Sequence, residues 1–454
     1  MLKAVDVYKK MPKGVKDTIK FCYSFIPLKL RLGSDFYDQL SFLEKSQWWS
    51  RKELENYQNE QLKRLIEHAF NNVPYYNRLF KSLRLTPQDI EKQEDLRKIP
   101  ILTKDIIRKN TQELRAINFN DKSVIKLSTS GSTGEPLNVL YDKKREYLNY
   151  DPYVWRFFGW AGLTVGGLYA KMSNWVLPSG IIYSYNPVRN LLILNPFALN
   201  IDKIDEYYKG LKQYGIQYLA GYPNSIAYMT KLFKSRGLQR TSNFKGIFCH
   251  SEYLYDWQRK LIEEFWGCQC FNWYGLDERV VLGVECKYHK NMHLCSDFGI
   301  TEFVKNPENS LKKIIATSLT NYAMPLIRYD TEDVGILIDH ECGCGRGFPL
   351  FCLQGGKGRG FAIGKDGSRI PVLHFGIPKA TDNVLQFQFI QNAPGILNLN
   401  IVKGPKFRDV DLNQIMVSIR ENLGGNMIIK SHFVDKVETT QNGKTEIFRQ
   451  KISN

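Results

Sequence analysis

The chain has 454 residues, of which 43% are hydrophobic and 13% aromatic, enough for one large core with a smaller domain beside it. No apolar run is long enough to cross a bilayer and charges interrupt the N-terminus, so we expect a cytoplasmic protein whose nine cysteines are reduced thiols or metal ligands. The formal net charge of +17 indicates an acidic partner, such as a nucleotide, CoA or an anionic membrane. The dispersed Lys and Arg residues exclude a typical nucleic-acid-binding module.

Residues 1–32 form a basic segment with eight Lys or Arg against two Asp. Aromatic and aliphatic residues, among them Phe21, Phe25 and Leu28, lie between the charges. The pattern predicts an amphipathic helix with two alternative positions. The helix either lies peripherally on the inner face of an anionic membrane or packs against the rest of the protein with its basic face in solvent. We favour the second arrangement.

A longer helix is predicted within residues 48–80. Its apolar residues Leu62, Leu65 and Ile66 recur at helical spacing, and Asn72 and Pro74 end it. We assign this region to the scaffold.

Residues 127–141, LSTSGSTGEPLNVLY, contain a Ser- and Gly-rich stretch between two strand-like segments. Two glycines permit a tight bend, and the bend directs backbone N–H groups and hydroxyls toward one point, as an anion site requires. The spacing of a Walker loop, GxxxxGK[ST], is absent. A flexible linker is the alternative, but the strand-like flanks favour a short connection. The candidate phosphate-binding residues are Ser128, Thr129, Ser130, Gly131, Ser132, Thr133 and Gly134.

This string resembles the phosphate-binding loop of the adenylate-forming ligases, most closely that of the branch containing phenylacetate-CoA ligase and the CapK-like proteins of polysaccharide gene clusters. Residues 48–110 are similar to the same branch. The resemblance implies an α/β fold, in which a large N-terminal domain of mixed and parallel sheets with helices precedes a small, mobile C-terminal α+β domain. It also implies ATP and Mg²⁺ as cofactors.

Between Ser123 and Leu353, strand-like and helix-like segments alternate. Alternation of this kind predicts βαβ units and a largely parallel sheet, whose ligands gather at the carboxyl ends of the strands. At one such end, the turn GYPNS at 221–225 resembles an acyl-pocket turn of this branch, which implies Tyr222 and Pro223 as substrate-pocket residues. A turn within the core is an equal alternative.

Two further turns at predicted strand ends supply the candidate nucleotide residues Ser251, Glu252, Trp273, Tyr274, Gly275 and Glu278. In the resembled family, a Ser-Glu pair lies near the adenine pocket, and the aromatic-Gly turn contacts the nucleotide. The family's Glu binds the Mg²⁺ that offsets phosphate charge, a role that falls here on Glu278. A surface turn with a solvated Glu is the structural alternative.

The segment PLIRYDTEDVG at 325–335 resembles the family's RYxTGD motif. The resemblance implies that Asp333 binds the ribose hydroxyls and that Arg328 supports catalysis. Glu332 stands where the family usually has Gly. If the motif requires φ > 0 there, Glu costs about 1 kcal/mol or more. We therefore expect either a different turn or weakened ATP binding.

Two clusters of cysteine and histidine predict a structural zinc site. Cys286 and His293 lie in one stretch, and Cys342 and Cys344 in another. Three thiolates and one imidazole form the closed tetrahedral set that structural Zn²⁺ prefers. The rival ligands are His289, Cys295 and His340, and free buried cysteines are the alternative to a metal. The resembled branch includes zinc-containing members.

The glycine-rich GGKGRG that begins at Gly355 predicts a hinge, which divides the chain into residues 1–355, including the basic helix at 1–32, and residues 356–454. The segment after the hinge is about two residues shorter than in the family and lacks the usual acid. Lys444, in ETTQNGK, matches the mobile catalytic lysine of the family. A solvated Lys in an Asn-Gly turn is the alternative, and Lys451 is a less favoured candidate for the same role.

The predicted function is ATP-dependent activation of a small carboxylic acid as an acyl-adenylate, with Lys444, Glu278 and Arg328 as catalytic residues. Transfer to an acceptor amine would form an amide in surface-polysaccharide biosynthesis. The first alternative is an aryl- or acyl-CoA ligase, for which CoA is a further cofactor. The second is a zinc-stabilised scaffold protein with decayed catalysis. The sequence leaves the acid, the acceptor and the oligomeric state, including a dimer, open.

Overall fold

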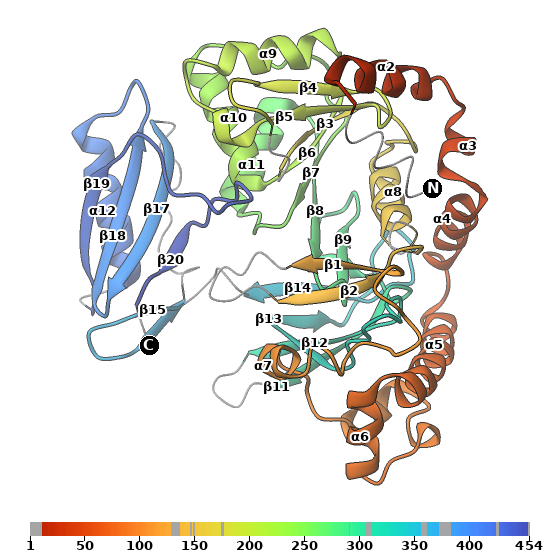
Figure 1. Ribbon diagram of the computed structural model, residues 1–454. Coiled ribbons are helices and arrows are strands. Elements are labelled where there is room, and N and C mark those ends of the chain that lie inside the picture. The colour runs from red at the N-terminus through yellow and green to blue at the C-terminus, as the bar shows by residue number, and fades with distance from the viewer. Residues whose placement is uncertain are drawn as a thin grey trace.

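The computed structural model describes residues 11–128, 137–145, 148, 150–173, 177–289, 291–305, 311–355, 361–371, 383–423 and 426–452. A large sheet runs through the middle of the molecule, N-terminal helices follow one rim, and a small four-stranded unit formed by the C-terminal part lies on the opposite side (Figure 1). Among the described residues, no helix combines the length and apolar character that crossing a bilayer would need.

Helices make up most of the first 110 residues. They are α2 (Lys13–Ser24), α3 (Leu28–Leu32), α4 (Ser34–Ser46), α5 (Arg51–Asn72), α6 (Pro74–Ser82) and α7 (Lys104–Lys109). Ser50 and Glu53 form a capping box that starts α5, and Pro74 starts the next helix. The predicted face of Leu62, Leu65 and Ile66 is fully buried, so the predicted helix and its end at Asn72 are confirmed.

The large sheet has twelve strands, in the order β11-β12-β13-β14-β10-β9-β8-β7-β6-β3-β5-β4. Its parallel part consists of β3 (Tyr169–Met172), β5 (Leu191–Leu194), β6 (Tyr218–Gly221), β7 (Gly246–His250) and β8 (Cys270–Gly275). The accompanying helices are α8 (Asp151–Trp160), α9 (Ile204–Gln213), α10 (Pro223–Ser235) and α11 (Asp256–Trp266). Every residue of β5 is buried, as expected for a strand covered on both faces.

The remaining strands of this sheet are antiparallel: β4 (Tyr183–Asn186), β9 (Leu282–Glu285), β10 (Met292–Leu294), β11 (Gly299–Lys305), β12 (Lys312–Ser318), β13 (Tyr329–Ile338) and β14 (Leu350–Gly355). The expectation of a largely parallel sheet up to Leu353 therefore holds only for its first half. No helix intervenes between β8 and β14 in the described part of the chain, and parallel neighbours need crossovers of a dozen residues or more.

The strand-like flanks of the Ser/Gly stretch form a separate hairpin of β1 (Val124–Ser128) and β2 (Asn138–Asp142). Ser128 pairs with Asn138, and its hydroxyl donates to Oδ1 of Asn138 at 2.6 Å. The predicted strands are thus present and adjacent. The predicted phosphate-binding residues from Thr129 to Gly134 lie outside the described residues.

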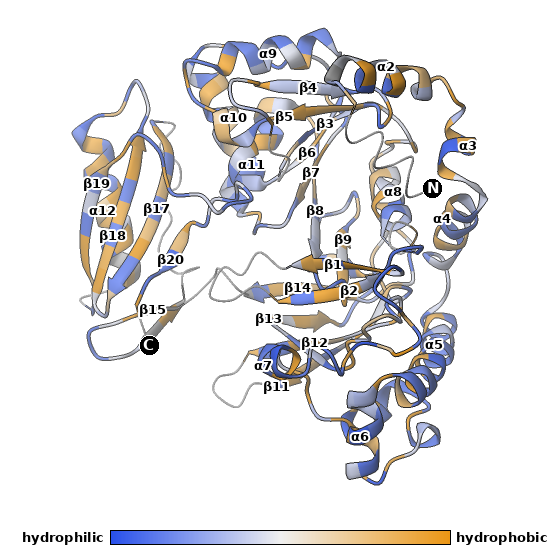
Figure 2. Ribbon diagram, in the orientation of Figure 1, coloured by the Kyte–Doolittle hydropathy of each residue, from blue (hydrophilic) through white to orange (hydrophobic). Residues whose placement is uncertain are grey.

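The C-terminal unit contains a four-stranded sheet of order β19-β18-β17-β20. Its elements are β17 (Val384–Ala393), β18 (Ile396–Lys403), α12 (Asp409–Leu423), β19 (Ile428–Phe433) and β20 (Phe448–Gln450), preceded by the hairpin β15 (Phe361–Ile363) and β16 (Arg369–Pro371). Phe389, Leu399 and Ile419 belong to a hydrophobic core of its own, and Figure 2 shows hydrophobic residues along these strands. The predicted boundary adjoins residues 356–360, which are not described, and stays a prediction.

Candidate active site

A cavity of about 240 Å³ lies at the carboxyl ends of β7 and β8, beside β13 and the C-terminal segment 440–447. Strand ends are where α/β sheets collect ligands. The lining residues include Lys104, Asn224, Ser251, Glu252, Trp273, Tyr274, Gly275, Glu278, Thr331, Asp333, Thr440, Lys444 and Thr445. Segments more than 300 residues apart in the sequence therefore share one pocket.

The two carboxylates predicted for ribose and Mg²⁺ are both buried and held by tyrosines. Asp333 is 7% exposed and accepts the hydroxyl of Tyr274 through Oδ2 at 2.9 Å. Glu278 is 5% exposed and accepts the hydroxyl of Tyr329 through Oε1 at 2.6 Å. Each hydrogen bond fixes a carboxylate at the wall of the cavity. A carboxylate held in this way fits a hydroxyl-bearing or cation-bearing ligand.

Glu332 adopts φ +63°, the left-handed conformation that favours glycine. Its Oε2 accepts Nζ of Lys104 at 2.7 Å, and Lys104 is 8% exposed. The chain therefore keeps a positive φ with Glu in place, and of the two expected alternatives weakened ATP binding stays a prediction. The ion pair with Lys104 accompanies this strained conformation.

Arg328 was predicted as a catalytic residue, but it is absent from the described lining of the cavity. Its guanidinium binds Glu302 at 2.9 and 3.0 Å and also donates to the carbonyl of Ile99. The backbone at Arg328 has φ +56°. The side chain joins β13 to β11 and to the segment before α7, and the supporting role of Arg328 in catalysis stays a prediction.

Lys444 lines the cavity, and its Nζ lies 5.9 Å from the ring centre of Tyr222. The neighbouring residue, Thr445, is tied to the large sheet by its backbone. Its N–H donates to Glu252 Oε1 at 2.8 Å, and its carbonyl accepts Nδ2 of Asn224 at 2.6 Å. Asn224 also donates to Glu252 Oε2 at 2.8 Å. The C-terminal segment is thus held where its lysine faces the predicted nucleotide residues.

Burial changes the protonation of two neighbours in this network. It raises the pKa of Glu252 to about 7, because desolvation outweighs the hydrogen bonds from Asn224 and Thr445. It lowers the pKa of His250 to about 3, helped by the positive charges of Lys171 and Lys444. The imidazole therefore stays neutral near pH 7. Its Nδ1 lies 2.9 Å from the hydroxyl of Ser251, which itself has φ +66°.

The other predicted residues divide between the cavity wall and the layer behind it. Ser251, Trp273 and Gly275 line the cavity. Tyr222 and Pro223 are buried beneath it and are not among its described lining residues. They start α10 and place Asn224 at the wall. Ser128 is likewise absent from the described lining.

Sequence reasoning missed several residues that line this cavity, among them Asn224, Lys104 and Thr445. Asn224 follows the predicted turn directly, so its position at a strand end was a usable signal. Lys104 follows Thr103, whose side chain caps α7, and nothing local in that pattern indicates a ligand site. Thr445 makes its contacts through its backbone N–H and carbonyl, and the type of a residue does not predict such contacts.

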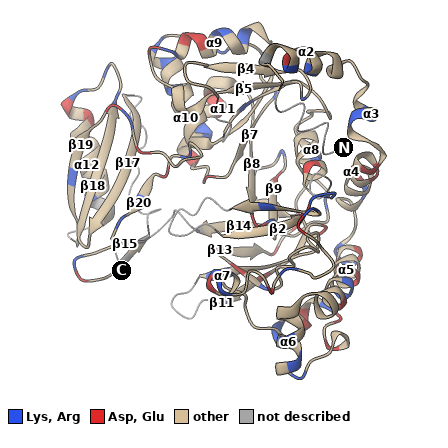
Figure 3. Cartoon of the chain, viewed as in Figure 1, with Lys and Arg blue, Asp and Glu red and all other residues tan. Residues whose placement is uncertain are grey.

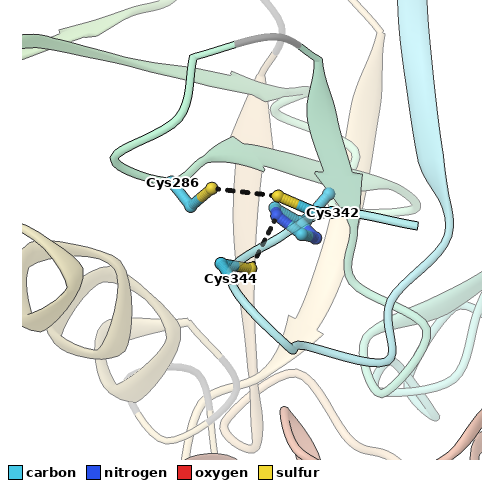
Figure 4. Close-up of side chains that lie close together, drawn as sticks. Cys286, Cys342 and Cys344 are labelled. Carbon is cyan, nitrogen blue, oxygen red and sulfur yellow. Dashed lines mark hydrogen bonds between the residues drawn. The ribbon is translucent and has the colours of Figure 1, made fainter. Parts of the chain in front are cut away.

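The predicted zinc ligands converge in space. The ligand atoms of Cys286, His293, Cys342 and Cys344 all lie within 4.8 Å of one another, and Figure 4 shows the three cysteines around a common centre. Sγ of Cys286 and Cys342 are 3.5 Å apart, and Sγ of Cys344 is 3.4 Å from Nε2 of His293. A tetrahedral Zn²⁺ with bonds of about 2.0 to 2.3 Å spaces its ligand atoms similarly.

The rival ligands lie outside this group. Nδ1 of His289 is 3.4 Å from Glu285 Oε2, and His340 is exposed. The four converging residues come from β10 and from the connections that follow β9 and β13. An ion there would fasten two connections of the antiparallel half of the sheet. The donor set and spacing fit a structural zinc ion.

Comparisons with known proteins agree with this geometry. Residues 363–451 match the family model of the CapK C-terminal domain. Over 307 residues the chain is 26% identical to phenylacetate-coenzyme A ligase of Thermus thermophilus. This alignment covers 65% of this chain and 68% of that protein. The fold is similar to 2-hydroxyisobutyryl-CoA ligase in its postadenylation state, with a TM-score of 0.70 at 15% identity over 90% of this chain and 92% of the other. For the thioesterification state of that ligase, the TM-score is 0.59 at 16% identity, over 90% and 91% of the chains. The chain is therefore similar in sequence to phenylacetate-coenzyme A ligases and, over residues 363–451, to the CapK C-terminal domain, and it shares its fold with 2-hydroxyisobutyryl-CoA ligase.

Proposed function

We propose that this protein activates a small carboxylic acid with ATP and Mg²⁺ and passes the acyl group from AMP to an acceptor. The observation that carries the proposal is that Lys444 shares one cavity with Tyr274, Glu278 and Asp333. Lys444 comes from the C-terminal unit, whereas the other three residues lie on or next to strands of the large sheet. A site for two-substrate chemistry at phosphate needs such converging groups, because catalysis is mainly positioning and charge stabilisation.

The residues of the chain divide these tasks. Asp333, held by Tyr274, accepts hydrogen bonds from ribose hydroxyls. Glu278, held by Tyr329, binds the Mg²⁺. Lys444 offsets the negative charge that develops between the acid and the α-phosphate. Bound ATP supplies the electrophilic phosphorus and the AMP leaving group.

The acceptor has two candidates. CoA is favoured by the similarity to phenylacetate-coenzyme A ligase and to 2-hydroxyisobutyryl-CoA ligase. An amine acceptor, with amide formation in surface-polysaccharide biosynthesis, is favoured by the CapK C-terminal domain at residues 363–451. That domain match covers the unit that carries Lys444.

Exchange of labelled pyrophosphate into ATP, measured over a panel of carboxylic acids, tests the first step. At least one acid should support exchange, and Lys444→Ala should lower the rate about 100-fold or more while ATP still binds. Lys451→Ala is the matched control, since Nζ of Lys451 bonds to Glu438 at 2.9 Å. ATP binding without exchange for any acid would favour the scaffold alternative. Consumption of free CoA thiol, as the thioester forms and AMP leaves, against consumption of a free amine then assigns the acceptor.

We also propose that Cys286, His293, Cys342 and Cys344 hold a structural Zn²⁺. Their ligand atoms lie within 4.8 Å of one another, and four protein ligands leave the ion no open position for substrate. The ion stabilises the sheet that bears Tyr274 and Asp333 without entering the reaction.

A further inference from the structure

Helix α2 exposes the face that a surface helix normally buries. At 100° per residue, Val15, Ile19 and Phe21 lie on one broad arc and Lys16 and Lys20 on the opposite one. Val15, Ile19 and Phe21 are exposed, and the side chain of Lys20 is also 44% exposed. Apolar residues of α2 are therefore exposed among the described residues, and the predicted packing of this helix on the protein stays a prediction.

The exposed apolar residues continue through the break between α2 and α3. Phe21 is 56% exposed, Phe25 is 70% exposed and Leu30 is 73% exposed. The rings of Phe21 and Phe25 meet edge to face, with centres 4.9 Å apart. Neither helix contributes a residue to the described hydrophobic core. Clustered aromatic residues in water are costly, and such clusters mark an interaction surface.

Two residues hold this segment on the protein. Leu28 lies so close to Gly166 that a Cβ on the glycine would come within 2.3 Å of it. The guanidinium of Arg31 donates to the carbonyl of Val188 and, through Nε, to that of Ile26 at 2.9 Å. The apolar face is therefore presented from a fixed position at the rim of the molecule, above the end of the large sheet (Figure 1).

Positive charge borders this surface. Lys16, Lys20, Lys29 and Arg31 lie on the two helices, with Asp17 as the single acidic residue of α2 and α3 (Figure 3). A helix with a wide apolar face flanked by Lys and Arg has the pattern of an interfacial helix. A second copy of the chain would bring two equally basic surfaces together, whereas anionic phosphodiester headgroups would neutralise them.

We propose that α2 and α3 place the protein on the surface of an anionic phospholipid bilayer. Phe21, Phe25 and Leu30 enter the boundary between headgroups and acyl chains. Lys20, whose side chain is 44% exposed, and Lys29, which is exposed next to Leu30, bind the headgroup phosphates. The attachment is peripheral and independent of the proposed catalytic activity, because α2 and α3 contribute no residue to the described lining of the cavity.

Sedimentation of the full chain with vesicles tests the proposal. The protein should pellet with vesicles of phosphatidylcholine and phosphatidylglycerol and bind about tenfold or more weakly to phosphatidylcholine alone. Salt should release it, because the headgroup contacts are screened. The double variant Phe21→Ser/Phe25→Ser should lose at least about tenfold in vesicle affinity. Ile117→Ser is the matched control, since Ile117 is 71% exposed elsewhere on the protein.

Thermal unfolding separates binding from folding. Both variants should unfold at the temperature of the unsubstituted protein, since the substituted side chains are exposed. Failure of the unsubstituted protein to pellet, or undiminished pelleting of the double variant, would overturn the proposal. Sedimentation velocity tests whether a second copy of the chain binds this surface instead. A dimer that dissociates on Phe21→Ser/Phe25→Ser, without vesicle binding, would assign the surface to a second copy.

Discussion

The backbone N–H of Thr445 donates to the carboxylate of Glu252 at 2.8 Å, and this contact spans 193 positions of the sequence. It joins the C-terminal unit to the end of β7. Because Lys444 precedes Thr445 directly, the position of the proposed catalytic amine depends on this hydrogen bond. The protonation of Glu252 therefore links pH to the docking of the C-terminal unit.

The first prediction concerns this carboxyl. Its pKa is about 7 in the folded protein, above the ordinary 4.5, because it is buried. The folded state thus binds the proton more tightly than the unfolded state, so the contribution of Glu252 to stability is complete below about pH 4.5 and is lost as the pH rises through about 7. The loss is on the order of 3 kcal/mol. Glu252→Gln should remove it.

Urea unfolding of both proteins at several pH values between about 5 and 8 measures this effect. The difference between them isolates Glu252 from the other titratable groups, because those groups are the same in both proteins. A difference in unfolding free energy that does not change with pH would contradict the prediction.

The second prediction concerns Glu332, which adopts the left-handed backbone conformation next to Asp333, the proposed ribose-binding residue. Glu332 has φ +63°, and its carboxylate binds Lys104 at 2.7 Å. Glu332→Gly and Glu332→Ala both remove the carboxylate, so the comparison between them isolates the backbone. The Gly variant should be about 1 kcal/mol more stable than the Ala variant, because only glycine adopts this φ without strain. Chemical unfolding measures the difference, and equal stabilities would show that the turn relaxes.

The third prediction concerns nucleotide affinity. Tyr274→Phe removes the hydroxyl that holds Asp333 at 2.9 Å, and it should weaken ATP binding about 5- to 10-fold, as expected for one lost hydrogen bond. Asp333→Asn should weaken it more, because the proposed ribose contact is lost as well. The double variant should resemble Asp333→Asn, since the two residues act as a unit. Calorimetric titration with ATP measures all three, and additive losses would contradict the coupling.

The fourth prediction concerns the metal. The purified protein should contain one zinc per chain, and Cys342→Ser and Cys344→Ser should each lose it. Either loss should lower the unfolding temperature, since a structural zinc contributes directly to folding. Cys352→Ser is the control, because Cys352 lies on β14 outside the four-residue group. Elemental analysis and thermal unfolding give the result, and zinc retained in both variants would contradict the ligand set.

The resemblance of short motifs to a known family predicted the part of the candidate site that lies at strand ends. Tyr274, Glu278 and Asp333 follow strand ends or lie in a strand, and the strand pattern places them at one edge of the sheet. The direction of Arg328 could not be predicted, because its backbone takes φ +56° and turns the guanidinium to Glu302. The contact of Lys104 with Glu332 joins positions 228 apart, and only the closed fold brings them together.

For the four zinc-ligand candidates, the sequence predicted the residues and the fold determines that they meet. Residue chemistry selected Cys286, His293, Cys342 and Cys344 from a larger set of thiols and imidazoles, and the sheet brings them within 4.8 Å. For α2, the sequence predicted an amphipathic helix but not that its apolar residues are exposed. Its amphipathic pattern was readable, but periodicity alone does not say which face meets the protein.

The order in which the cavity walls occur along the chain has a consequence for biosynthesis. A ribosome completes the strands bearing Tyr274 and Asp333 long before it makes the segment 440–447 with Lys444. Since large domains begin to fold during translation, a nascent chain acquires its nucleotide pocket before the amine that the proposed reaction requires. Under the proposed mechanism, the nascent chain would therefore consume no ATP until the segment with Lys444 has been translated.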